Sequence, residues 1–223
     1  MNLGKEWTAI ARRELPQWQA CAKMLNLAFY AGTSREAPVI AGDIDGFELR
    51  VTCTDDRKGA AKPVTLYEVH YPAFASPIRI TRETKTTRVG ILRRVIDVKD
   101  LQIGDEVGDR KFDKLALIDA EDVETAAAFL TTRRRQAITE LLGTSGLRDV
   151  VVSEATMSFQ TRKVEGSAGR LTGNILGMVE FARVMADAST AHERPASGYG
   201  LLPNEKLESD SWFASPESQD STP

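Results

Sequence analysis

The sequence has few of the residues that build metal, redox or disulfide sites. Among its 223 residues there are two cysteines, Cys21 and Cys53, and two histidines, His70 and His192. A structural zinc site draws its ligands mainly from these two residue types, so a dedicated zinc site is nearly excluded. The spacing of Cys21 and Cys53 does not call for a disulfide, and we interpret both as reduced thiols. We expect no metal and no other cofactor.

Long apolar runs are also absent. No stretch approaches the roughly 18 apolar residues that a membrane-spanning helix needs, and the N-terminal segment lacks the apolar core of a secretory signal. Hydrophobic residues make up 42% of the chain and charged residues 27%, which is typical of a globular domain with an ordinary solvated surface. We therefore expect a cytoplasmic protein that contacts a membrane at most peripherally.

Recognisable catalytic and nucleotide-binding motifs are missing as well. Gly42, Gly104 and Gly108 form neither a dinucleotide-binding pattern nor a P-loop. His70 shares a predicted strand face with Glu68, which is the beginning of a general-base arrangement. No serine or thiol nucleophile motif accompanies this pair. The sequence therefore favours a non-catalytic protein.

Apolar periodicity extends over almost all of the chain before its last 35 or so residues. Helical spacing marks residues 7–28, as two short helices or as one that restarts at Pro16. Two further helices are expected at 123–142 and 171–187. Alternation of apolar and polar residues, with a hairpin turn at Asp45–Gly46, predicts strands. These strands are expected at 40–42, 47–53, 64–71, 78–80, 112–118, 150–152 and 155–160.

Consecutive strands joined by short turns predict an α+β fold, in which an antiparallel sheet carries helices packed on one face. We expect one domain over residues 1–190, including the amphipathic N-terminal helix. The segment 191–223 is rich in Ser, Pro, Gly and acidic residues, and it is predicted to be a disordered acidic tail. The side chains expected to be mostly buried are those of Phe47, Leu49, Val51, Val69, Leu130, Leu141, Phe159, Ile175, Met178 and Ala182.

Positive charge is concentrated between residues 79 and 94, although the chain as a whole has a net charge of −3. A solvated loop is the simpler interpretation of this basic stretch. The functional interpretation is that the basic stretch is an electrostatic contact surface for an acidic protein or an anionic membrane. The acidic tail would then compete with that partner for the basic stretch. Nucleic acid is disfavoured because no aromatic residue stands among the arginines to stack on bases. The residues of the basic stretch are Arg79, Arg82, Lys85, Arg88, Arg93 and Arg94.

Aromatic residues near both ends are further candidates for contacts with a partner. Trp7 and Trp18 belong to a basic amphipathic segment, which is able to lie on a membrane interface or to pack on its own domain. Trp212 and Phe213 form an apolar pair within the acidic tail. Short disordered motifs use such aromatic residues as anchors on a partner protein.

Three segments carry a family resemblance: Cys21–Leu27, Gly42–Val51, and Gly108–Asp113 with the Phe129–Leu130–Thr131 that follows it. Together these segments resemble a bacterial domain family whose function is unknown. Members of that family often stand beside membrane-spanning segments. The resemblance implies no catalytic residue.

The leading hypothesis from the sequence is a non-catalytic protein-interaction or scaffold module with a protein partner. A peripheral membrane or lipid-binding module is the first alternative. An enzyme whose residues follow no recognised motif is the second.

Overall fold

The computed structural model describes residues 4–33, 36–55, 63–74, 77–82, 95–96, 110–120 and 123–187. The predicted tail at 191–223 lies outside these residues. The helices are α1 (Gly4–Met24), α3 (Arg110–Leu115), α4 (Val123–Phe129), α5 (Thr132–Gly143) and α6 (Ala168–Ala186). The strands are β1 (Ala28–Tyr30), β2 (Val39–Ile44), β3 (Phe47–Asp55), β4 (Pro63–His70), β5 (Ile78–Arg82), β6 (Val95–Ile96), β7 (Ala116–Ala120), β8 (Arg148–Ser153) and β9 (Thr156–Gln160).

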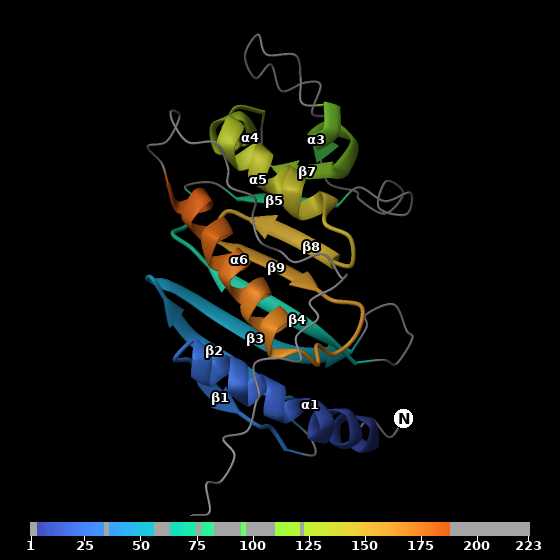
Figure 1. Cartoon of the computed structure of the whole chain (residues 1–223). Helices are drawn as coiled ribbons and strands as arrows, with labels where there is room; N and C mark the ends of the chain where they lie inside the picture. The colour runs from blue at the N-terminus through green and yellow to red at the C-terminus, as the bar shows by residue number, and fades with distance from the viewer. Residues whose placement is uncertain are drawn as a thin grey trace, which may run out of the picture.

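In the part of the chain that the structure describes, the strands form one nine-stranded sheet. Its order is β1-β2-β3-β4-β9-β8-β5-β7-β6, and each neighbouring pair is antiparallel. The β8–β9 hairpin lies between β4 and β5, so two strands from late in the chain join its earlier strands into one sheet (Figure 1). The predicted α+β class with an antiparallel sheet is confirmed.

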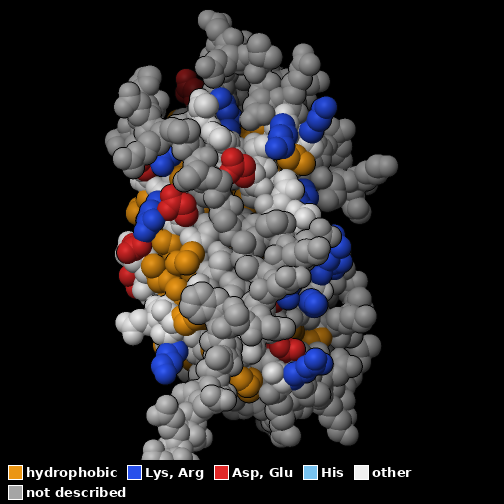
Figure 2. Space-filling view, in the orientation of Figure 1, with side chains coloured by type: hydrophobic (Ala, Val, Ile, Leu, Met, Phe, Trp, Pro, Cys, Tyr) orange, Lys and Arg blue, Asp and Glu red, His pale blue; other side chains and the backbone are white. Residues whose placement is uncertain are grey.

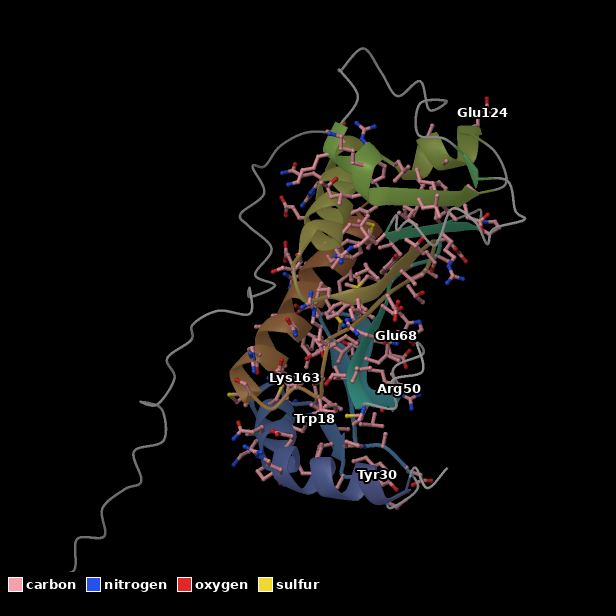
Figure 3. The ribbon with its side chains drawn as sticks, turned by 90° about the vertical axis from the view of Figure 1, so that its right-hand side faces the viewer. Trp18, Tyr30, Arg50, Glu68, Glu124 and Lys163 are labelled. Carbon is pink, nitrogen blue, oxygen red and sulfur yellow. The ribbon has the colours of Figure 1, made fainter. Side chains whose placement is uncertain are left out.

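Helix α6 lies across one face of the sheet, in contact with α1 on one side and α5 on the other (Figure 1). Figure 3 shows Arg50 and Glu68 extending from the sheet on the side away from α6. The alternation along β4 explains this arrangement: Tyr67 and Val69 are fully buried, whereas Glu68 is half-buried and His70 is exposed. The predicted pair of His70 and Glu68 therefore forms on a solvated strand face, with 3.1 Å between Nε2 and Oε1.

The core lies between the sheet and its helices and contains the residues expected there. Nine of the ten side chains predicted to be mostly buried are at most 2% exposed. The tenth, Phe47, is half-buried and packs against the same core. Tyr67 and Phe159 stack at the centre, with ring centroids 4.8 Å apart. The periodicity of the sequence therefore identified the faces of its helices and strands.

The turn of the first hairpin also forms where it was predicted. Ile44 pairs with Phe47, which leaves Asp45 and Gly46 as the two loop residues. Both have positive φ, 56° and 85°, as a type I′ turn requires. The Asp43 carboxylate accepts a hydrogen bond from the Gly46 N–H at 2.9 Å, so a side chain fixes the turn from outside the loop.

The first helix differs from its prediction in its continuity at Pro16 and in its C-terminal end. It is continuous through Pro16, and it ends at Met24 rather than near Ala28, which belongs to strand β1. Asn26 stops it by taking the left-handed conformation with φ 53°. The N–H of Leu27 then bonds the carbonyl of Ala22 at 2.8 Å, and the N–H of Asn26 bonds that of Lys23 at 3.3 Å. These two bonds form a Schellman motif.

Two predictions in the middle of the chain were wrong. Phe112 lies in helix α3 rather than in a strand, and the strand β7 starts only at Ala116. The expected helix at 123–142 is two helices, because Thr131 is extended (ψ 157°) and caps α5 by accepting the Arg134 N–H at 3.4 Å. A threonine that caps a new helix interrupts the old one without changing the apolar spacing.

Both cysteines are buried and unpaired, which supports a prediction about their reactivity. Burial raises the pKa of Cys53 to about 12 and also raises that of Cys21. At pH 8 we expect Ellman's reagent to modify the native thiols at least about 100-fold more slowly than those of the urea-unfolded chain, because reaction requires opening of the core. Rapid modification of the native protein would contradict the described packing of α1 and β3.

Candidate anion-binding cleft

Two residues of the basic stretch fall within the described structure, and they have different surroundings. Arg79 is exposed on β5, opposite Asp119 on β7. Arg82 is half-buried, and its guanidinium donates to the carbonyls of Leu147 at 3.1 Å and Thr144 at 3.2 Å. The others (Lys85, Arg88, Arg93 and Arg94) lie outside the described residues.

Of the four aromatic candidates, the structure describes the side chain of one. Trp18 is 1% exposed, and its indole N–H donates to the carbonyl of Glu165 at 2.9 Å. Trp18 therefore packs on its own domain and presents no surface to a membrane or partner. Trp7 lies in α1, but its side chain is outside the described part of the structure, as are Trp212 and Phe213.

Arg82 and Trp18 each bond the carbonyl of a residue, Leu147 and Glu165 respectively, that lines a cleft of about 240 Å³. Three segments line this cleft: the loop between α5 and β8, the connection between β9 and α6, and the first turns of α6. Figure 3 places Lys163 beside the lower part of α6, and Figure 2 shows Lys and Arg side chains along the flank where β9 leads into α6. The lining residues are Ser145, Gly146, Leu147, Thr161, Arg162, Lys163, Glu165, Arg170 and Asn174.

The loop between α5 and β8 forms one wall. Gly146 has a φ of 93°, which only glycine adopts easily, and this lets the chain turn from the helix into the strand. Arg82 engages the carbonyls of Thr144 and Leu147, at the two ends of the loop. These two carbonyl acceptors are thereby occupied, and the positively charged guanidinium of Arg82 contacts the loop that forms this wall. Burial lowers the pKa of Arg82, but an arginine remains protonated at neutral pH.

The connection between β9 and α6 forms the second wall, and hydrogen bonds within it and to two other elements, β4 and α1, hold it. The Thr161 hydroxyl donates to the Lys163 carbonyl at 2.7 Å. The Glu165 N–H donates to the Thr65 hydroxyl on β4 at 2.8 Å, and Gln17 on α1 accepts the Ala168 N–H at 3.2 Å. These bonds fix the backbone of the segment at both ends, so the Cα positions of Arg162 and Lys163 are set before any ligand arrives.

Two buried polar side chains form the floor. Glu165 is 5% exposed, and its Oε1 accepts from Arg170 Nε at 2.9 Å and from the Ser167 N–H at 3.2 Å. Asn174 is 7% exposed, and its Nδ2 donates to the Tyr67 hydroxyl at 3.2 Å. Within the described residues, neither Glu165 Oε2 nor Asn174 Oδ1 has a recorded hydrogen bond, and neither is a fully enclosed atom. The floor therefore offers two accessible acceptors.

The lining is cationic in a chain whose net charge is −3. Arg162, Lys163 and Arg170 stand against a single carboxylate, that of Glu165, so the lining carries a net charge of +2. Arg170 is paired with that carboxylate. Arg162 and Lys163 are exposed, and no ion pair involves them in the part of the chain described. Their side chains are therefore available to an external anion.

Sequence reasoning missed these cations because no run of charge marks them. Arg162 and Lys163 are only two adjacent residues, and Arg170 is seven residues beyond Lys163. The available signal was the position of Arg162 and Lys163 just after the predicted strand 155–160 and shortly before the predicted helix 171–187, whose observed N-cap is Ser167. Arg82 and Trp18, which bond the carbonyls of the lining residues Leu147 and Glu165, were the neighbours of the cleft that the sequence singled out.

Comparisons with known proteins assign nothing to this site. No family model, curated protein or solved structure matches the chain, so the family resemblance described above stays a prediction. Within the described residues there is no cluster of three or more candidate metal ligands. None of the described helices combines the length and apolarity needed to cross a bilayer.

Proposed function

We propose that this protein is a non-catalytic binding module that takes an anionic ligand in the cleft. The observation that carries the proposal is the convergence of Arg162, Lys163 and Arg170 on one cleft that contains a single carboxylate. Two of these cations have no ion pair within the described residues, and the guanidinium of Arg82 adds positive potential behind the loop wall. Charge-assisted hydrogen bonds from such groups are the usual means of anion recognition.

The proposal narrows the interaction hypothesis from the sequence: the partner, whatever its size, presents an anionic group to this cleft. A cytoplasmic location is part of the proposal. It is supported by two unpaired cysteines in a chain that has no others, because reduced thiols are typical of that compartment.

Binding of inorganic phosphate to the full chain, measured by calorimetry at low salt, tests the proposal. We expect a dissociation constant on the order of 1 mM, because exposed cations attract only moderately. The variant Arg162→Gln with Lys163→Gln should weaken binding at least about ten-fold, since it removes two charge-assisted contacts. Binding should also weaken as sodium chloride is added, because salt screens exposed charges.

The matched control is Arg50→Gln with Arg79→Gln. It removes the same charge from two exposed residues on the strands β3 and β5, away from the cleft lining. It should change the affinity less than about two-fold, because only long-range, screened attraction is lost. Equal losses of affinity in the two double variants would show that phosphate binds at the basic stretch or without a defined site. No detectable binding by the native chain would refute the proposed function.

A further inference from the structure

The cleft differs in chemistry between its rim and its floor. The rim carries Arg162 and Lys163, both exposed. The floor carries Glu165 and Asn174, each more than nine-tenths buried and each with one accessible oxygen. Resting on the proposed function, we infer that the ligand is a phosphorylated polyol, such as a sugar phosphate. Its phosphate lies between the rim cations and its hydroxyl groups reach the floor.

The floor favours hydroxyl groups over a second charge. Glu165 Oε2 and Asn174 Oδ1 are acceptors, so a ligand group that enters must donate hydrogen bonds to them. An ammonium group would donate, but it would approach the Arg170 guanidinium, whose Nε lies 2.9 Å from Glu165 Oε1. A neutral hydroxyl avoids that repulsion. It also gives the buried acceptors partners that replace water, so little hydrogen bonding is lost on binding.

The rim favours a phosphate over a carboxylate. After Arg170 has paired with Glu165, two cations remain at the rim, and a phosphate monoester carries close to two negative charges at neutral pH. Adjacent cations on one loop are able to share its three terminal oxygens, whereas a carboxylate offers one charge and two oxygens.

The size and lining of the cleft exclude larger and aromatic ligands. At about 240 Å³ the cleft lies just below the range of ordinary small-molecule pockets. Its lining includes Leu147 but no aromatic side chain among the described residues. Stacking on an aromatic ring is one common way to hold a base, and the described lining offers no such ring for the base of a nucleotide. A small polyol instead carries several hydroxyl groups, which are able to donate hydrogen bonds to Glu165 and Asn174 on the floor.

Calorimetric titration of the full chain with a panel of probes tests the inference. The panel contains glucose 6-phosphate, ribose 5-phosphate, glycerol 3-phosphate, phosphoserine, inorganic phosphate and glucose. At least one polyol phosphate should bind at least about ten-fold more tightly than inorganic phosphate, because added hydrogen bonds to buried acceptors increase affinity by such factors. Glucose alone should bind more weakly than either.

The variant Glu165→Gln separates the two ends of the cleft. It keeps the size of the side chain but removes the lone carboxylate, so inorganic phosphate should bind a few-fold more tightly. The preference for the polyol phosphate over inorganic phosphate should fall at the same time, because one floor acceptor becomes a partial donor. Thermal unfolding of the variant should show whether its fold is retained.

The outcomes distinguish the inference from the proposed function. If inorganic phosphate binds in the cleft and no polyol phosphate binds more tightly, the inference is overturned and the proposed function stands. Tighter binding of phosphoserine than of every polyol phosphate would also overturn it, in favour of an ammonium on the floor. If nothing binds, both fail. Vesicles with and without a phosphoinositide headgroup distinguish a lipid-borne polyol phosphate from a free one.

Discussion

Substituting Phe159 with alanine is expected to lower the free energy of unfolding by about 4 kcal/mol, because it removes a large buried ring and leaves a cavity. Phe159 is fully buried on β9 and stacks on Tyr67 of β4. It lies where the β8–β9 hairpin joins the strands from earlier in the chain. Urea denaturation followed by circular dichroism measures the loss.

The matched control for this substitution is Ser158→Ala, the neighbouring residue on the opposite face of β9. Its side chain is half-buried and has no recorded hydrogen bond among the described residues. We expect a change within about 0.5 kcal/mol. A loss below about 1 kcal/mol for Phe159→Ala would contradict the described core, because truncation of a buried phenylalanine costs several times as much.

Substituting Arg134 with alanine is expected to cost about 3 kcal/mol, because it leaves buried carbonyl groups without their charged donor. Arg134 is 7% exposed and donates to the carbonyl of Phe129 at 3.1 Å and to that of Met185 at 2.6 Å. These carbonyls lie at the C-terminal ends of α4 and α6, where a cation also opposes the helix dipole. The guanidinium also lies 5.0 Å from the ring centroid of Phe129.

The adjacent Arg135 provides the control for Arg134. Its guanidinium makes longer bonds, at 3.5 Å to the Leu130 carbonyl and 3.4 Å to the Thr132 hydroxyl, and the residue is half-buried. Arg135→Ala should cost no more than about 1 kcal/mol. Equal effects of the two substitutions in urea denaturation would show that Arg134 does not join the ends of the two helices.

The faces of most strands and the residues of the core were predictable from the sequence because their signals are local. Two-residue alternation places Leu49, Val51 and Val69 on the buried face, and the Asp45–Gly46 turn fixes the register of the first hairpin. The spacing of Ile175, Met178 and Ala182 likewise marks the buried side of α6. A residue's own neighbours along the chain determine these outcomes.

The remaining features depend on capping and on contacts between distant segments. The end of α1 depends on the left-handed conformation of Asn26, and the break before α5 depends on the cap by Thr131. Neither changes the apolar spacing. The cleft brings the loop near Gly146 against a connection near Lys163 and the start of α6. Nothing in the sequence alone places these three segments together.

The most direct test of the central claim is a map of backbone amide shifts by NMR while inorganic phosphate is added to the full chain. An anion held in the cleft should shift the amides of residues 145–147, 161–165 and Arg170 most strongly, with one common dissociation constant. Arg162→Gln with Lys163→Gln should raise the dissociation constant read from these shifts at least about ten-fold, with changes in the ligand-free spectrum confined to amides near the substituted residues. Shifts centred on Arg79 and the strands around it, or no saturable shifts at all, would contradict the assignment of the cleft as the binding site.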